Sequence, residues 1–205
     1  SVPVGSPGSL EAVQRSAFDG LAGLCASNDA IDAARQRGLP VVVTSASDVG
    51  DQVTIDDFAA GQDLARHVRR LGHQRVAVIV ETLDEDADVP VELAVPEFER
   101  LVADVRNRGF LDSWERWRGL FAGLEGAETS VVVGGLNSRE AGRAAAPLVL
   151  DRADRPTAII AVSDVIALGV LEAVDARGLV AGRDVSVAGF AYLFGMPVNT
   201  TVQMV

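Results

Sequence analysis

The chain has 205 residues, 48% of them apolar and 23% charged, which is enough to bury a core in one large domain or two modest ones. Its formal net charge of −11 would repel a phosphate backbone, so this stretch of chain is a poor candidate for direct nucleic-acid binding. All 18 basic residues are arginine, which excludes enzymes that depend on a phosphate-loop, Schiff-base or kinase lysine.

The single cysteine, Cys25, excludes an intrachain disulfide and fits a reducing compartment. It lies in an apolar run, residues 21–26, where a small buried hydrophobe is its expected role. The apolar stretches are far shorter than a membrane span, and the first residues lack a secretion signal, although processing would remove one. We therefore expect a globular, cytoplasmic protein that has no membrane partner.

The first part of the chain alternates helical and strand patterns. The expected helices cover residues 10–17, 31–37 and 58–71, and the expected strands cover residues 20–25, 39–43, 53–55 and 76–80. Gly38 and Gly72 stand where the second and third helices must stop in a left-handed conformation. Strands alternating with helices predict a parallel sheet that is covered on both faces.

The stretch 81–96 differs, because it is rich in Asp and Glu and is broken by Pro90 and Pro96. We interpret it as a solvated linker or loop and place a subdomain boundary near Leu83. Beyond it, the sequence predicts a helical stretch at 98–124 with a break at 107–109, a strand at 130–133 and a helix at 139–150.

Residues 156–190 contain a complete strand, helix and strand. An unbroken apolar run at 158–162 is followed by apolar residues at helical spacing, by Gly178 and by a second strand at 185–188. A crossover of this length forces the two strands to be parallel. The fold class that follows is α/β, with doubly wound parallel sheets that bind ligands beyond the carboxyl ends of their strands.

Polar residues gather at the ends of these predicted strands. Ser45 follows one strand, Asp56 and Asp57 follow another, and Ser163 and Asp164 follow the strand at 158–162. Hydroxyl and carboxylate groups at such an edge suit a polyhydroxylated ligand. Helix capping explains each of these residues at least as well, because Asp57, Ser163 and Asp164 each stand at the start of a predicted helix.

Motifs for catalysis or metal binding are missing from the sequence. His67 lies within a predicted helix and His73 in the turn after it, without cysteine or carboxylate ligands at usable spacing. The sequence has no GxSxG, HExxH or paired-cysteine motif. We expect no catalytic residue, no metal and no cofactor.

A series of motifs resembles the effector-binding region of the lactose-repressor (LacI/GalR) family of bacterial transcription regulators. In chain order they are FDGL at 18–21, RGLPVVV at 37–43, VTIDD at 53–57, LGHQRVAVI at 71–79, ERWRG at 115–119, PTAIIAVSDVIALGVL at 156–171, RGLVAGRDVSVAGF at 177–190 and NTTV at 199–202. The order of the whole series, which spans most of the chain, is more specific than any one motif.

The resemblance implies a periplasmic-binding-protein-like fold of two α/β subdomains joined by crossing strands, with a small effector between them. We assign residues 1–82 to an apparently incomplete N-terminal subdomain, 83–196 to a C-terminal one and 197–205 to a crossover back. The family acts as homodimers that bind operator DNA through a headpiece, which this chain lacks together with the first strand and the last helix of the fold. A fragment of a longer protein is therefore expected.

The resemblance also implies roles for single residues. Arg116 matches the effector-binding arginine of the family, and Ser163 with Asp164 matches polar residues of its cleft. Ser45, Asp56 with Asp57, and Phe190 fall at further cleft positions. After Phe190 the family has one or two aspartates, but here Ala191 and Tyr192 follow, so one expected effector contact is missing.

Two other classes of protein stay open. A sugar-binding receptor of a transporter shares this fold, and an upstream signal peptide instead of a helix-turn-helix would identify it. An enzyme on a doubly wound sheet could use Asp56, Asp57 or Asp164 as acid or base, although helix capping accounts for these carboxylates.

Overall fold

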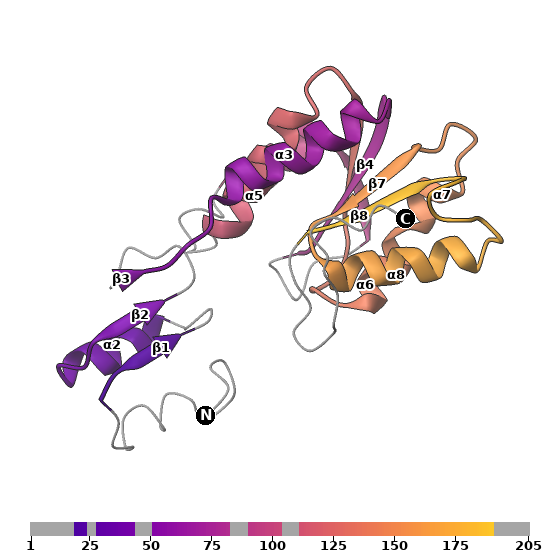
Figure 1. Ribbon diagram of the computed structural model, residues 1–205. Coiled ribbons are helices and arrows are strands. Elements are labelled where there is room, and N and C mark those ends of the chain that lie inside the picture. Colours follow the sequence, from indigo (N-terminus) through magenta and orange to yellow (C-terminus); the bar gives the residue numbers. More distant parts are fainter. Residues whose placement is uncertain (1–18, 24–27, 44–50, 83–89, 104–110, 191–205) are drawn as a thin grey trace. The chain divides into compact units, whose positions relative to one another are not determined.

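The computed structural model describes residues 19–23, 28–43, 51–82, 90–103 and 111–190 of the chain (Figure 1). These residues form two compact units. The smaller unit holds the described residues up to Asp57 together with residues 111–114, and the larger holds Phe58–Ala103 and the described residues from Glu115 on. Within the described ranges, no helix has the length and apolar character needed to cross a membrane.

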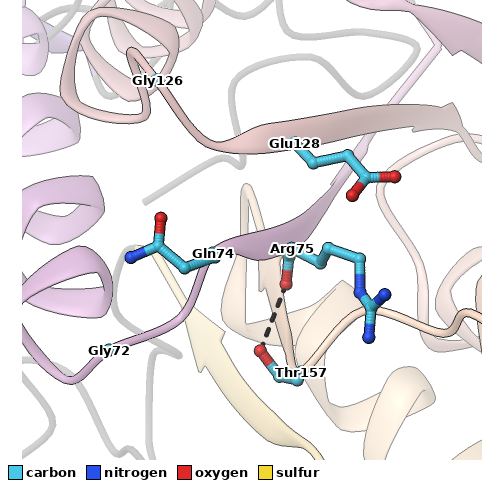
Figure 2. A pocket seen from close by; sticks show the side chains of 6 residues that line it. All are labelled: Gly72, Gln74, Arg75, Gly126, Glu128 and Thr157. Atoms are coloured by element: carbon cyan, nitrogen blue, oxygen red, sulfur yellow. Dashed lines mark hydrogen bonds between the residues drawn. The ribbon is translucent and has the colours of Figure 1, made fainter.

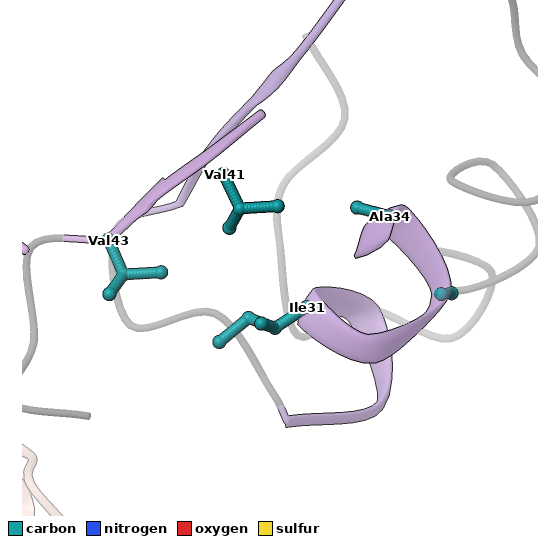
Figure 3. Packing of buried hydrophobic residues seen from close by; sticks show 5 residues of the cluster. Ile31, Ala34, Val41 and Val43 are labelled. Carbon is teal, nitrogen blue, oxygen red and sulfur yellow. The ribbon is translucent and has the colours of Figure 1, made fainter. Parts of the chain in front are cut away.

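The smaller unit is a parallel three-stranded sheet with one helix. Its strands are β1 (Leu21–Gly23), β2 (Val41–Val43) and β3 (Asp51–Gln52), in that order, and its helix is α2 (Asn28–Gln36). Figure 3 shows the side chains of Ile31 and Ala34 from α2 facing Val41 and Val43 from β2. Because successive strand residues alternate between faces, Val42 is left 38% exposed.

The predicted stop at Gly38 is confirmed, since this glycine has φ +71° and its N–H bonds to the carbonyl of Arg35 at 2.8 Å. The predicted strand at 53–55 is wrong. Strand β3 comprises Asp51–Gln52, and Val53 and Ile55 are each 65% exposed. The apolar residues at 53 and 55 indicated a strand, but pairing with β2 ends at Val53, whose N–H donates to the carbonyl of Val43 at 2.9 Å.

The larger unit is built on a five-stranded sheet with the order β5-β6-β4-β7-β8. Its strands are β4 (Arg75–Val80), β5 (Val91–Ala94), β6 (Glu128–Val133), β7 (Ala158–Ala161) and β8 (Ser186–Gly189). Four of them are parallel, as predicted, and β5 runs antiparallel along β6. The apolar runs of β4 and β7 are buried, because helices cover the sheet on both faces.

The helices of this unit are α3 (Asp57–Arg70), α4 (Val95–Leu101), α5 (Leu111–Gly123), α6 (Arg139–Ala145), α7 (Pro147–Leu150) and α8 (Asp164–Asp175). In Figure 1, α3 and α5 lie on one side of the sheet and α6, α7 and α8 on the other. This distribution is the one that right-handed crossovers from a central β4 produce. The predicted stops at Gly72 and Gly178 are confirmed, with φ values of +94° and +64°.

Helices α6 and α8 approach each other through glycine. A Cβ atom on Gly142 would overlap the carbonyl oxygen of Ile166, and one on Gly169 would overlap the carbonyl oxygen of Arg139. Two helices can come this close only where side chains are absent. The contact holds the first turns of α6 and α8 together.

Two predictions in this part of the chain need correction. The stretch 81–96 is not only a linker, because it contains β5 and the start of α4. The acidic residues and prolines of this stretch indicated a loop, but they are compatible with a strand at the edge of a sheet, because one side of an edge strand is not covered by another strand. The predicted helix 139–150 is divided at Pro147, which lacks a backbone N–H, into α6 and α7.

The division into units also differs from the predicted boundary near Leu83. Strand β4 lies in the middle of the larger sheet, hydrogen-bonded to β6 and β7, and the larger unit begins at Phe58. Charge and proline content marked the stretch 81–96, which belongs to the larger unit and is not its boundary. The unit boundary itself falls at the first residues of α3, between Asp57 and Phe58, where composition gives no signal.

Candidate functional site

The carboxyl ends of β4, β6, β7 and β8 meet at one edge of the five-stranded sheet, which we call the carboxyl edge. It comprises residues 81–82, 134–138, 162–164 and 190, which directly follow these strands. Thr82 and Ser163 are each only 9% exposed there. Buried polar groups are uncommon unless they are hydrogen-bonded, so this edge is a place to look for function.

Arg116 reaches the carboxyl edge from α5. Its Nη1 atom donates a hydrogen bond of 3.3 Å to the carbonyl oxygen of Val162, at the end of β7. Its guanidinium carbon lies 4.2 Å from the ring centroid of Phe190, at the end of β8, which makes a cation–π contact. Phe190 is 9% exposed and Arg116 is half-buried, so two strand ends fix the guanidinium in place.

Ser163 is the N-cap of α8, as predicted. Its hydroxyl oxygen accepts a hydrogen bond of 3.2 Å from the N–H of Ile166. The same hydroxyl donates to the side-chain oxygen of Asn137 at 2.6 Å. The sequence-based prediction missed Asn137, although it follows the predicted strand at 130–133 and the rule used for the other strand ends would have found it.

Asp164 is the first residue of α8 and is half-buried. Burial raises the pKa of its carboxyl group above the ordinary value. The carboxylate lies against β8, because a Cβ atom on Gly189 would overlap Asp164 Oδ1. No group in the described residues donates a hydrogen bond to this carboxylate, which leaves it as an acceptor for a ligand.

The other predicted site residues are distributed differently. Asp56 is exposed and Asp57 is 6% exposed at the start of α3, and both belong to the smaller unit. Ser45 lies outside the described residues. The structure thus brings Arg116, Phe190, Ser163 and Asp164 to one edge of the larger unit.

The opposite edge of the same sheet, which we call the amino edge, holds a hollow of about 490 Å³. Figure 2 shows the residues that line it, which are Gly72, Gln74, Arg75, Gly126, Glu128 and Thr157. All six are exposed. The Thr157 hydroxyl donates to the carbonyl oxygen of Arg75 at 3.3 Å and lies 2.9 Å from Nδ1 of His73.

Burial lowers the pKa of His73, so its ring is neutral at neutral pH. Across the described ranges, no three His, Cys, Asp or Glu side chains are grouped as a metal site would require. Exposed charges such as Arg75 and Glu128 keep most of their hydration and bind a small ligand weakly. The carboxyl edge is therefore the stronger candidate site.

Comparison with known sequences links the chain to regulators. Residues 65–203, more than half of the chain, match the periplasmic binding protein-like domain. An HTH-type transcriptional regulator of Mycolicibacterium smegmatis is 32% identical over 76% of the chain and 44% of its own length. The HTH-type transcriptional repressor PurR of Salmonella newport is 29% identical over 81% of the chain and 45% of its own length. The chain thus spans less than half the length of these curated relatives.

Solved structures share the fold. A LacI-family regulator of Corynebacterium glutamicum has a TM-score of 0.71 at 22% identity, over 94% of this chain and 58% of that one. One from Arthrobacter in complex with lactose has a TM-score of 0.68 at 24% identity, over 94% and 64%. One from Enterococcus faecalis with bound ribose has a TM-score of 0.65 at 23% identity, over 87% and 58%. At these identities the likeness is one of fold.

Proposed function

The chain belongs to the periplasmic binding protein-like domain family, as an effector-binding region of the LacI/GalR type, and on this premise we propose that it senses a sugar or a related polyol. The effector binds at the carboxyl edge of the larger unit. Its occupancy changes the affinity of the whole regulator for operator DNA. The neighbours that hold ribose and lactose support this class of effector.

One observation carries the proposal. Arg116 is fixed at the ends of β7 and β8 by the Val162 carbonyl group and the Phe190 ring. A guanidinium group has five N–H donors in a planar arrangement, which suits hydrogen bonding to hydroxyl groups. Since it is half-buried, its hydrogen bonds to a ligand compete with water less than those of a surface arginine do.

The chemistry of the edge fits a polyhydroxylated molecule. Sugar hydroxyl groups both donate and accept hydrogen bonds, so they need donors such as Arg116 and acceptors such as the Asp164 carboxylate. The C–H groups of a sugar ring form an apolar surface that packs on aromatic rings, and Phe190 supplies one. Ser45, Asp56 and Asp57 are proposed as further contacts on the resemblance alone.

The wider role follows from the relatives. Since they are named transcriptional regulators, we propose that the protein is a cytoplasmic homodimer that has no enzymatic activity. DNA contact would come from a headpiece outside this chain, because a net charge of −11 disfavours contact by the chain itself. The effector would act by binding two states of the dimer with different affinity.

A ligand screen followed by DNA binding tests the proposal. Thermal shift and calorimetry on the full-length protein with ribose, lactose, other aldoses and polyols should find at least one ligand with a saturable, one-to-one isotherm. The same ligand should change the affinity for operator DNA in fluorescence anisotropy. Binding without any effect on DNA would point to a transport receptor, and turnover of the sugar would point to an enzyme.

A further inference from the structure

We propose that Asn137 is a direct hydrogen-bond donor to the effector, and that Ser163 acts as the positioning residue that holds Asn137 in the required orientation. The inference rests on the proposed function, because it refines the same carboxyl edge. The inference assigns a binding role to Asn137, which the sequence-based prediction missed. It also changes the role of Ser163 from ligand contact to support of Asn137.

The hydrogen bonds of Ser163 carry the first step. Ile166 N–H can only donate, so the Ser163 oxygen must accept that bond, which is 3.2 Å long. The Ser163 proton is then directed at the side chain of Asn137, 2.6 Å away. This length is normal for O–H···O and short for N–H···O, so the Asn137 atom that faces Ser163 is its carbonyl oxygen.

The orientation of the amide follows from that bond. With its oxygen turned toward Ser163, Asn137 must turn its NH₂ group away, and no acceptor for that group occurs in the described parts of the chain. Asn137 is exposed, whereas Ser163 is 9% exposed with its proton committed. Asn137 can therefore reach a ligand with two donors, and Ser163 has none to offer.

The loop that carries Asn137 is fixed at both ends. Gly134 N–H donates to the Val80 carbonyl at 2.8 Å, and Thr82 N–H donates to the Gly135 carbonyl at 3.0 Å. Directly after Asn137, the Ser138 hydroxyl accepts from Ala141 N–H at 3.1 Å and caps α6. An amide held on a fixed loop loses little conformational entropy when a ligand binds.

The partner chemistry is a molecule with at least two hydroxyl groups. Asp164 directly follows Ser163 in the chain and can only accept hydrogen bonds when ionised, while the Asn137 NH₂ group can only donate. One hydroxyl of a sugar can donate to Asp164 while another accepts from Asn137. A ligand in which one of these hydroxyls is missing leaves a polar group unpaired, so the pair selects intact sugars over deoxy sugars.

The binding test compares Asn137→Asp with Gln74→Glu in calorimetric titrations of the full chain. The probes are ribose, lactose, other aldoses and their deoxy analogues. Asn137→Asp keeps an oxygen for Ser163 but removes both donors, so affinity for the bound sugar should fall by about 10-fold or more. Gln74→Glu makes the same amide-to-carboxylate change at the exposed amino edge, and affinity should stay within about 2-fold. Unchanged affinity in Asn137→Asp would overturn the assignment.

A double-mutant cycle tests the positioning role. If Ser163 acts through Asn137, Ser163→Ala and Asn137→Ala should each weaken binding, and the double variant should be no weaker than Asn137→Ala alone. Ser163→Thr retains a hydroxyl group and should restore most of the affinity. Fully additive losses would mean that Ser163 touches the effector itself, which contradicts its role as a support.

A measurement without ligand separates this inference from the proposed function. The Asn137 side-chain NH₂ resonances in ¹⁵N-labelled protein, assigned by their loss in Asn137→Asp, should be well dispersed in the wild type and averaged in Ser163→Ala. Identical NH₂ resonances in the two proteins would overturn the positioning role even if no sugar binds. Lack of binding by every sugar together with dispersed resonances would count against the proposed effector class alone.

Discussion

The two edges of the five-stranded sheet differ in how their polar groups meet water. At the carboxyl edge, Ser163 is 9% exposed, Arg116 and Asp164 are half-buried, and burial raises the pKa of Asp164. At the amino edge, the hollow of about 490 Å³ is lined entirely by exposed residues. This hollow and the partly desolvated polar groups are therefore at opposite ends of the same strands.

The difference teaches that empty volume alone is a weak guide to a site. A ligand hydrogen bond gains most where the protein group has already lost water, since water competes less there. The cation–π contact and the hydrogen bonds at the carboxyl edge also fix its groups before a ligand arrives. The amino edge has a hollow, but its polar side chains are exposed to water.

Among the variants that test the difference between the two edges, a substitution of Arg116 should have the largest effect on sugar binding. Arg116→Ala should weaken binding of the sugar identified in the screen by about 100-fold, or about 2.7 kcal/mol, because it removes a fixed, half-buried cation. Arg118→Ala is the matched control, since Arg118 is exposed on the same helix and pairs with Glu115 at 2.9 Å. Equal affinity of the two variants in calorimetry would show that the effector does not bind at the carboxyl edge.

A pair of glycine substitutions, one within α8 and one beyond its C-terminal end, sharpens the comparison. In Gly169→Ala, the new Cβ would lie 2.7 Å from the backbone nitrogen of Arg143, so α6 must move away. Overpacking of this kind costs about 1–3 kcal/mol, and moving α6 should disturb the Asn137 loop and weaken sugar binding as well. Urea denaturation and calorimetry measure the two effects.

Gly178→Ala, just beyond the other end of α8, is the control. Its Cβ meets nothing within 4 Å, but φ is +64°, so the cost of about 1–2 kcal/mol arises only from the backbone. Sugar affinity should stay unchanged. If both variants weaken binding equally, loss of stability rather than geometry at the carboxyl edge explains the effect.

Asp164 should make stability depend on pH. Because burial raises its pKa in the folded state, ionisation costs folding free energy as pH rises from the unfolded pKa of about 4 through the folded pKa. Asp164→Asn should therefore match the wild type near pH 3 and be more stable than it at pH 7. Since the group is half-buried, the gain should stay below about 1 kcal/mol. Urea melts at pH 3, 5 and 7 measure it, and a difference independent of pH would contradict the burial of the carboxylate.

Substitutions at the amino edge should have the smallest effect. Arg75→Gln and Glu128→Gln change exposed charges at that hollow, so stability should stay within about 0.5 kcal/mol and sugar affinity within about 2-fold. Denaturation and calorimetry check both values. A large loss of affinity would reverse the comparison and move the effector to the amino edge.

Much of the larger unit could be predicted from sequence. The glycines at 72 and 178 mark helix ends, and the runs at 76–80 and 158–162 mark buried strands, because these features act through local backbone geometry and burial. Strand β5 could not be found this way. It is an edge strand whose pairing with β6 depends on a partner far away in the chain.

The candidate site was predictable only in part. Ser163 and Asp164 stand at a strand end and a helix start, which sequence shows directly, whereas Arg116 was identified by family resemblance. The contacts that orient these groups, Arg116 with Phe190 and Ser163 with Asn137, join residues far apart in the chain. The binding roles of all seven predicted residues stay predictions.

The sequence by itself determined most helices and buried strands, the parallel α/β class and the family resemblance, because each depends on the spacing of neighbouring residues. Only the tertiary structure decided the strand order, the antiparallel β5, the start of the larger unit at Phe58 and the meeting of α5 with the ends of β7 and β8. These features depend on which surfaces exclude water together, and local spacing does not specify the partner of each surface.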